Sequence, residues 1–497
     1  MYNLKIAVIS ALGCLVLSAC SVTPIAISDK ERAILVKADM QSLFSDQEAI
    51  KAPITLYDAM ARSIKYNLDH RLSLLEKTVS KRQLDVSHYD LLPTLTAEAG
   101  YNQRSNYTGA TSRSLLTGDE SLEASTSQEL EHTTRRVNLV WNVLDFGVSY
   151  VRAQQQANQV LIREEQRKKV VQNIVQDVRA AYWRAASAQR LLGEMDKLLH
   201  RSNQALQRAK MLESLRLKKP LQTLHYQKAL LDIVRQMWNI RQDLSTAKTE
   251  LAALMNLRPG TEYEIDISEG DLRVVGLEVE LEVLETYALH HRPELNEGHY
   301  QSRISALEVK KTMLRSMPGL ELNFSPNKDS NSFLFHKQWN EAGASISWNL
   351  FNIVSAGARL EEAESRQELE KMRRLSLGMA VLTQVNLAWQ RYQLEAKNFS
   401  IIKDIAGVEK RIKDQVLAEK QAQTQTELEV IRTLAGELVA RMQKERSYAE
   451  LQNARARIYN SIGLDPLPVR PKSNDLAALS DAIKTTMESW NNGAGLQ

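Results

Sequence analysis

Cysteine is almost absent from this chain of 497 residues, and its two cysteines, Cys14 and Cys20, both lie close to the N-terminus. The rest of the chain therefore has neither disulfides nor cysteine-based metal sites. The sequence also lacks a glycine-rich phosphate loop and a His-Glu-x-x-His motif. These absences argue against the common nucleotide-binding and zinc-dependent enzymes, so we predict a protein that is not an enzyme and that needs no cofactor.

The richest group of possible metal ligands is His290 and His291 with Glu297 and His299. Ligand spacing alone is weak evidence for a metal site. In the internal repeat described below, the two adjacent histidines align with ordinary residues near a helix end. We therefore predict that the chain holds no metal ion.

Charge of one sign is not concentrated anywhere, because 64 basic and 60 acidic residues are spread through the chain and give a net charge of only +4. A nucleic-acid partner is not expected without a basic patch. Glycine and aromatic residues are also scarce, at 19 residues and 6%. Alanine, leucine, glutamine, glutamate, lysine and arginine dominate instead, and these residues favour helices.

The longest apolar run near the N-terminus is also short. Residues 6–16 follow Lys5 and precede Leu17-Ser18-Ala19-Cys20, and this run is too short to span a membrane as a helix. The arrangement resembles a bacterial lipobox, in which the signal peptide, residues 1–19, is removed and Cys20 is acylated, as with palmitate. The alternative is an ordinary signal peptide with a chance cysteine. Ser21, where an aspartate would favour the inner membrane, indicates the outer membrane.

The chain contains an internal repeat. Segments that match at an offset of 207 residues are Trp141–Asp145 with Trp348–Asn352, and Leu254–Leu257 with Ser461–Leu464. Earlier segments match at an offset of 225, as Leu56–Leu68 does with Leu281–Pro293. The first copy must therefore hold 18 additional residues between Pro93 and Trp141, which we interpret as a longer surface loop.

Each copy contains two segments in which apolar and polar residues alternate, which is the period of a β-strand. We expect strands near residues 94–107 and 133–144 in the first copy, and near 319–326 and 342–350 in the second. One apolar and one polar face over about 9 to 11 residues is typical of transmembrane β-strands. A soluble sheet with one wet face would show the same alternation.

Long helices follow the strands. Apolar and small residues recur at heptad spacing between residues 171 and 206, so a helix from about 150 to 215 would be about 100 Å long. Turns are expected at Lys218-Lys219-Pro220 and at residues 423–426. The expected units are an N-terminal lead-in (20–53), repeat 1 (54–260, with a helical hairpin at 150–257), a linker (261–280), repeat 2 (281–466, with a hairpin at 355–464) and a polar tail (467–497).

Four membrane strands would leave two open edges, so the sheet must close with other copies of the chain. The duplicated order of helix, two strands, long helix and return helix, with Leu91-Leu92-Pro93 and Leu144-Asp145-Phe146-Gly147 at its junctions, resembles the TolC-like outer-membrane factors. The resemblance covers residues 54–466. It implies a mainly α-helical protein with membrane β-structure, in which a homotrimer forms a helical barrel and a 12-stranded transmembrane β-barrel.

The resemblance also implies a function and partners. The protein would be a passive channel of a tripartite efflux or type I secretion system, anchored by lipid in the outer membrane of a Gram-negative bacterium. Its helical barrel would lie in the periplasm and would contact an adaptor protein and an inner-membrane pump. The alternative is a lipid-anchored periplasmic coiled-coil adaptor or scaffold without a pore, for which long helical hairpins are equally suitable.

Two sets of site residues follow from the resemblance. The hairpin tips would dock the adaptor through Arg216, Leu217, Lys218, Lys219, Gln423, Thr424 and Gln425. Neither tip has the glycine of the family's Val-Gly-Leu-like motif, which argues against a standard drug-efflux partner and leaves the type of adaptor open. Glu429 and Arg432, just after the second tip, would form the periplasmic gate, where three carboxylates around the axis favour cations. The alternative is a solvated Glu429 that pairs with Arg432 on the same helix.

Overall fold

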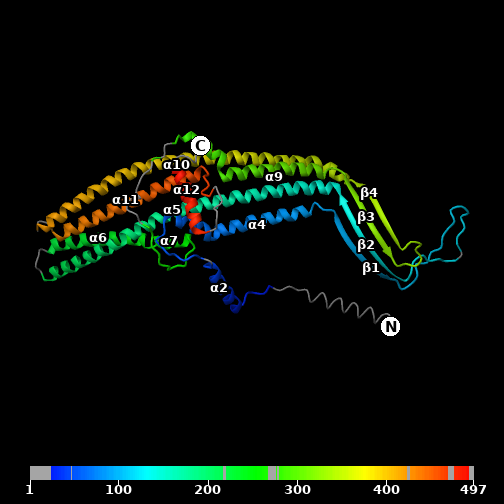
Figure 1. Ribbon diagram of the computed structural model, residues 1–497, viewed down its shortest axis with the longest axis horizontal. Helices are drawn as coiled ribbons and strands as arrows, with labels where there is room; N and C mark the ends of the chain where they lie inside the picture. Colours follow the sequence, from blue (N-terminus) through cyan, green and yellow to red (C-terminus); the bar gives the residue numbers. More distant parts are fainter. Residues whose placement is uncertain are drawn as a thin grey trace.

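The structure is a computed structural model that describes residues 24–45, 47–121, 123–215, 220–266, 276, 279–422, 426–467 and 475–491. The molecule is long, narrow and mostly helical, with a small sheet at one end and two helical hairpin tips at the other (Figure 1). Helix therefore dominates the fold, as the composition predicts.

The helices and strands follow one another in the order of the repeat. In chain order they are α2 (Asp29–Leu43), α3 (Leu56–Tyr66), α4 (Leu68–Tyr89), β1 (Thr94–Gln103), β2 (Glu131–Asn142), α5 (Val143–Ser214), α6 (Pro220–Ser245), α7 (Ala247–Leu254), α8 (Leu281–His291), α9 (Pro293–Arg315), β3 (Gly319–Asp329), β4 (Gln338–Ser347), α10 (Leu350–Gln421), α11 (Glu427–Ser461) and α12 (Leu476–Asn491).

The duplication is visible in these bounds. Helices α5 and α10 each have 72 residues, and α10 begins and ends 207 positions after α5. Helix α8 begins and ends 225 positions after α3. The additional residues of the first copy lie in the loop between β1 and β2, which extends beyond the end of the sheet (Figure 1). Their position agrees with the surface loop that the two offsets predict.

Both long helices begin earlier than expected, because an asparagine caps each of them. The Asn142 side chain accepts hydrogen bonds from the backbone N–H groups of Leu144 and Asp145, at 3.1 Å each. Asn349, the repeat counterpart of Asn142, accepts one from Phe351 at 3.1 Å. Such caps satisfy backbone donors that have no partner within the helix. Each 72-residue helix would extend about 108 Å at about 1.5 Å per residue.

The four strands form one antiparallel sheet in the order β1-β2-β3-β4. They overlap the four expected ranges, although β4 begins at Gln338 rather than near 342, because the pairing with β3 extends to Lys328. The central pair, β2 with β3, joins the two repeats. Strands β1 and β4 each have one neighbour, so both edges of the sheet are open in the described chain.

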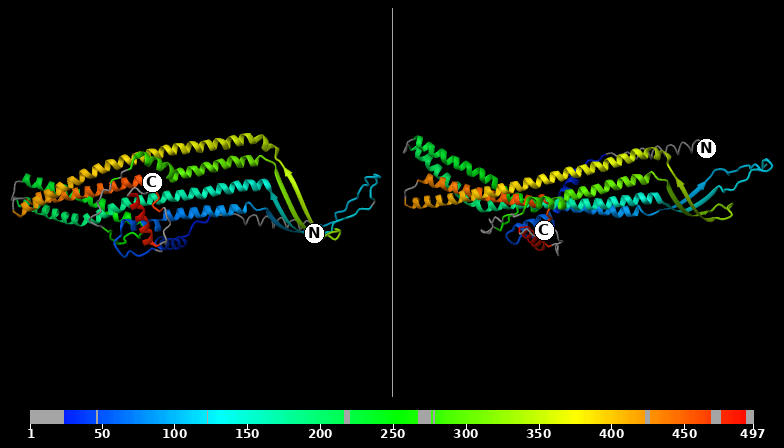
Figure 2. Two further views of the ribbon diagram at one scale, coloured as in Figure 1. Left: turned by 45° about the horizontal axis from the view of Figure 1, so that its top comes forward. Right: turned by 90° about the horizontal axis from the view of Figure 1, so that it is seen from above.

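The long helices form one curved layer (Figure 2). Next to the sheet the order across this layer is α4, α5, α9, α10, and towards the tips it is α6, α5, α11, α10. Helix α5 therefore has a neighbour on both sides along its length, while α10 lies at one edge throughout. Helices α3 and α12 pack against each other on one side of the layer, where the Ser480 hydroxyl donates to Asp58 at 2.7 Å.

The largest core lies at the middle of the molecule, where α3, α8 and α12 cover the long helices. Trp183 of α5 packs edge to face against Tyr448 of α11, with ring centroids 4.9 Å apart, and Tyr448 also packs against Phe399 of α10. The Tyr182 hydroxyl donates to the carbonyl of Asp266 at 2.9 Å. This core binds both repeats to each other and to the segment that connects them.

The two return helices end in the same way. Asn256 and Gly463, which are 207 positions apart, both have positive φ angles, of 55° and 80°. Asparagine and glycine are the residues that adopt this left-handed conformation most readily. A Cβ atom on Gly463 would lie 2.8 Å from the backbone of Arg292, so glycine is also required there by space. The first return helix is interrupted at Thr246, between α6 and α7.

Candidate functional site

The sheet has one apolar and one polar face. The register of the strands places a single set of apolar side chains on one face, here called the apolar face: Leu95, Ala97, Ala99 and Tyr101 of β1, Val137, Leu139 and Trp141 of β2, Leu320, Leu322, Phe324 and Pro326 of β3, and Ala342, Ala344 and Ile346 of β4. All of these side chains are exposed, and Ile346 and Leu95 reach 76% and 67%. Nothing in the described chain covers this face.

The opposite face is polar and more buried than the apolar face. It carries His132, Ser325 and Asn327, which are all buried. The Arg136 guanidinium donates to the Asn327 side chain at 2.8 Å. A soluble sheet buries its apolar face and exposes its polar face. This sheet instead leaves its apolar face exposed and buries part of its polar face. Such a pattern is typical of strands that have lipid on one side and a polar interior on the other.

Exposed apolar side chains also follow the edges of the helical layer. On α10 they are Leu369, Met372, Leu375, Met379, Leu387, Leu394, Ile401, Ile405, Val408 and Ile412. Several of these are seven residues apart, which is the spacing of a coiled-coil seam. Within the described chain this seam has no partner helix, since the buried residues of α10 lie on its other side.

The opposite edge of the layer carries matching seams. Helix α4 exposes Leu72, Val79 and Val86, and α6 exposes Leu224, Leu231 and Trp238, again at intervals of seven. One edge of the chain thus presents a long seam on α10, and the other presents two shorter seams in line along the layer. The same asymmetry holds for the sheet, where β4 lies at one edge and β1 at the other.

The hairpin tips lie at the end of the molecule far from the sheet (Figure 1). The proposed docking residues Arg216, Leu217, Lys218, Lys219, Gln423, Thr424 and Gln425 fall outside the described residues, as does Cys20. On either side of the first tip, α5 ends at Ser214 and α6 begins at Pro220. At the second tip, Thr426 caps α11 by accepting from the Glu429 N–H at 3.3 Å.

Glu429 and Arg432 lie one turn apart on α11, with the carboxylate and guanidinium 3.2 Å apart. Both side chains are exposed, at 42% for Glu429 and 57% for Arg432. Within the described chain each therefore faces solvent while the two remain paired. Such an exposed pair contributes little to stability in a single chain.

Glu427, two residues before Glu429, also belongs to the tip region, although no sequence pattern indicates its contacts. Its carboxylate lies 3.0 Å from Arg201 of α5 and 3.7 Å from Lys420 of α10, so it connects three helices next to the tips. Burial alone would raise the pKa of Glu427, but the hydrogen bond and charge of Arg201, with the charge of Lys420, lower its pKa on balance. No local pattern connects Arg201 with Glu427, because 226 positions separate them.

A second set of ion pairs joins the helices further from the tips. Arg441 of α11 donates two hydrogen bonds to Glu194 of α5, at 2.9 and 3.0 Å. Glu437, which is buried, lies 3.0 Å from Lys413 of α10. These pairs fix the three helices relative to one another, and their long sequence separations again left no signal in the sequence.

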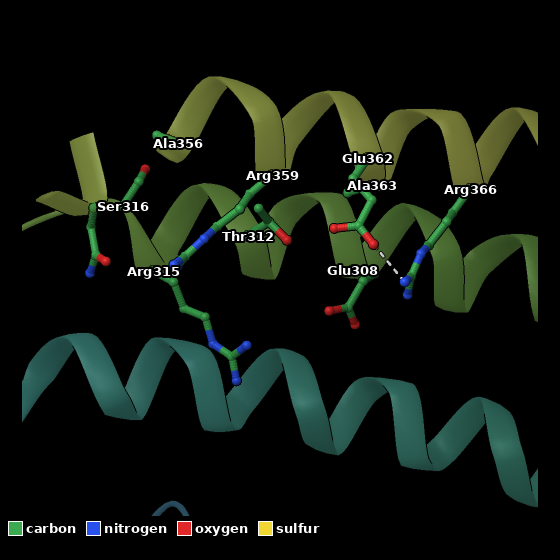
Figure 3. A pocket seen from close by; sticks show the side chains of 10 residues that line it. Glu308, Thr312, Arg315, Ser316, Ala356, Arg359, Glu362, Ala363 and Arg366 are labelled. Atoms are coloured by element: carbon green, nitrogen blue, oxygen red, sulfur yellow. Dashed lines mark hydrogen bonds and ion pairs between the residues drawn. The ribbon is translucent and has the colours of Figure 1, made fainter. Parts of the chain in front are cut away.

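A polar groove of about 290 Å³ lies between α9 and α10 near the sheet (Figure 3). Its lining alternates in charge, with Arg315, Arg359 and Arg366 beside Glu308 and Glu362. The Arg366 guanidinium donates to Glu362 at 2.6 Å. Because its charges compensate one another, this groove has the character of a solvated helix contact.

No group of three or more metal-type ligands occurs in the part of the chain that the structure describes. Of the histidines singled out above, His291 stacks on Tyr287 with ring centroids 3.9 Å apart, while His299 contacts Arg374 at 3.0 Å. Their surroundings are those of ordinary helix residues. Among the described helices, none is both long and apolar enough to cross a membrane.

No family model and no curated protein matches the chain at the level of sequence. Solved structures match its fold over most of its length. The Campylobacter jejuni CmeC outer-membrane channel aligns with a TM-score of 0.64 and 11% identity, over 94% of this chain and 97% of that one. The Neisseria gonorrhoeae MtrE channel, in its open state, gives 0.63 and 15%, over 84% and 94%. The outer-membrane channel OprN gives 0.61 and 17%, over 82% and 89%. The chain therefore has the fold of the TolC-like outer-membrane channels.

Proposed function

We propose that three copies of this chain form an outer-membrane channel, a passive conduit for an efflux or type I secretion system. Each copy would contribute its four strands to a 12-stranded transmembrane β-barrel and its long helices to a periplasmic helical barrel. The observation that carries this proposal is the exposed apolar face of the sheet, opposite a polar and partly buried face. A soluble protein would lose stability by leaving such a face in water.

The open edges support closure with other copies. In lipid, the backbone groups at the edges of β1 and β4 must find partners, and the β1 edge of one copy suits the β4 edge of the next. The helical layer has the same requirement, since the seam on α10 suits the seams on α4 and α6 of a neighbour. Such contacts join two different edges of the chain. They close into a ring when the rotation that relates neighbouring copies divides a full turn into equal parts, as one third of a turn does for three copies.

The remaining parts of the proposal concern anchoring and partners. Acylated Cys20 would hold the N-terminus at the outer membrane, and the two tips would dock a periplasmic adaptor that connects the channel to an inner-membrane pump. Cys20→Ser should abolish labelling with radioactive palmitate and leave the precursor uncleaved. Labelling that persists in Cys20→Ser would contradict the lipid anchor, and Cys14→Ser, which should be labelled normally, is the control.

Glu429 and Arg432 would form the narrow periplasmic mouth. Three Glu429 carboxylates around the axis would attract cations, and Arg432 would limit their repulsion. Glu429→Gln should therefore reduce cation selectivity, and Arg432→Ala should raise single-channel conductance. Glu364→Gln, which changes an exposed acid on α10 far from the tips, is the matched control. If Glu429→Gln has the cation selectivity of wild type, Glu429 does not contribute to the gate and only forms the solvated ion pair with Arg432.

The channel itself is tested in planar lipid bilayers. The purified protein should produce discrete conductance steps, and heating before gel electrophoresis should shift its mobility, as for other β-barrels. A lipid-anchored adaptor or scaffold without a pore would bind the membrane but give neither conductance steps nor heat-modified mobility, and this result would contradict the proposal.

A further inference from the structure

At the end of the sheet far from the helices, a row of different chemistry interrupts the apolar face, and of the apolar-face residues only Tyr101 lies beyond this row. The register places Ala99, Arg135, Lys328 and Gln338 side by side across the four strands on this face. The next row towards the helices consists of Ala97, Val137, Pro326 and Asn340. The cationic side chains Arg135 and Lys328 therefore lie next to a largely apolar row on the same face of the sheet.

Arg135 and Lys328 are direct register partners on adjacent strands. Like charges in this position repel each other, and both side chains are exposed. Neither has an ion-pair partner among the residues that the structure describes. Glu98 and Arg136 belong to the polar face, and the nearest acid on the apolar face, Glu131, lies four residues from Arg135 and accepts from Gln103. An anion between the two cations would relieve their repulsion.

A shallow concavity of about 620 Å³ occupies the same place. Its lining consists of three consecutive residues from each strand, 97–99, 135–137, 326–328 and 338–340. In every triplet the two outer residues belong to the apolar face, so the concavity opens on that face. Its floor is made by small or apolar side chains such as Ala97, Ala99 and Val137, while Arg135 and Lys328 lie at its outer end.

We infer that this concavity binds a phosphorylated lipid of the outer leaflet, with the phosphate between Arg135 and Lys328 and an acyl chain along Ala97, Val137 and Pro326. The inference rests on the proposed function, in which the apolar face meets lipid and the end far from the helices lies outside. We expect a phosphate in the lipid headgroup, because the Arg135 guanidinium and the Lys328 ammonium can both donate strong, charge-assisted hydrogen bonds to phosphate oxygens. A cationic row at the boundary of an apolar band is also where lipid headgroups lie.

The test uses the complete assembly in a neutral detergent and a fluorescent diacyl phosphatidic acid in mixed micelles. The double variant R135Q/K328Q should bind this lipid at least about tenfold more weakly than wild type, because both charge-assisted contacts are lost. The matched control R104Q/R113Q removes two exposed cations from the loop between β1 and β2, outside the lining of the concavity, and should bind within about twofold of wild type.

Unlabelled competitors identify the source of the anion. Phosphatidic acid should compete at far lower concentration than inorganic phosphate or the matched neutral diacylglycerol. Unchanged affinity in R135Q/K328Q, equal losses in both double variants, or equally strong competition by phosphate alone or by diacylglycerol would each overturn the inference. Conductance in planar bilayers is measured on the same samples. If the wild-type protein forms pores but does not bind phosphatidic acid preferentially, only this inference is contradicted. If the wild-type protein forms no pores, the proposed function is contradicted.

Discussion

Helices α5 and α10 hold the same place in the two repeats and have the same length, yet only α5 is buried along most of its course. Helix α5 lies between neighbours from its own chain on both sides, while α10 lies at the edge of the layer. The exposed seam of α10 is apolar nevertheless. The comparison teaches that this chain has two kinds of apolar surface, one that it covers itself and one that it leaves exposed. Under the proposed function, lipid or another copy would cover the exposed one.

The largest difference should appear between core positions of the two helices. Leu191 of α5 is fully buried, and its counterpart 207 positions later is Asn398, which makes only long hydrogen bonds to Glu395 and Ser447. Leu191→Ala should lower the free energy of unfolding by about 2 to 5 kcal/mol. Asn398→Ala should change it by less than about 0.5 kcal/mol. Denaturant unfolding in detergent measures both, and equal losses would break the comparison.

The sheet offers the same contrast between its two faces. Leu139→Arg places a charge in the middle of the apolar face and should cost about 2 to 4 kcal/mol of folding free energy in a bilayer. Asn138→Arg places the same charge on the polar face and should be tolerated. Folding of both variants into lipid vesicles is followed by heat-modified gel mobility. Equal tolerance at the two neighbouring positions would mean that the sheet meets water on both faces.

The role of the α10 seam in contacts between copies is tested by placing a charge at an exposed seam position, which leaves the core of the single chain unchanged. Leu387→Glu should weaken each contact between copies by about 1.5 to 3 kcal/mol, because a leucine side chain loses its place in an apolar seam. The unfolding of the single chain should change little. Gln390→Glu, an exposed polar position one turn away, is the control. Light scattering in detergent gives the mass, and an assembly unaffected by Leu387→Glu would place the interface elsewhere.

The ends of the return helices provide a smaller difference. Gly463→Ala should cost about 1 to 2 kcal/mol for the left-handed conformation, and more because its Cβ meets the Arg292 backbone at 2.8 Å. Asn256→Gly keeps the conformation accessible at the counterpart position and should cost only about 0.5 to 1.5 kcal/mol, for the hydrogen bond that the Asn256 side chain donates to the Leu43 carbonyl at 2.8 Å. The thermal midpoints of the two variants compare these costs, and a nearly neutral Gly463→Ala would contradict the strained position.

The smallest effect concerns pH at the tips. The pKa of Glu427 is lowered in the folded protein, chiefly by Arg201 acting against burial. Its stabilising contribution is therefore present above its ordinary value of 4.5 and is lost as the pH falls through the lower, folded pKa. Arg201→Gln should thus destabilise the protein by less than about 1 kcal/mol at pH 7 and by nothing at strongly acidic pH. A loss that is the same at both pH values would exclude this linkage.

Much of this fold follows from periodicity. The alternation in Leu320, Leu322 and Phe324 indicated a strand and its apolar face, and the two offsets of the repeat located the long loop. Periodicity alone does not locate the starts of α5 and α10, because the capping role of Asn142 and Asn349 depends on single side chains rather than on a period. Ion pairs such as Arg201 with Glu427 could not be predicted, since they form only when distant helices pack.

Native mass spectrometry of the intact complex released from detergent micelles tests the central claim most directly. Under the proposed function, copies of the same chain cover the open edges of the sheet and the exposed seams on α10, α4 and α6. The measured mass should correspond to three chains, and Leu387→Glu should shift it to one. A wild-type mass of a single chain, under conditions that preserve other membrane oligomers, would contradict the closed ring and with it the channel.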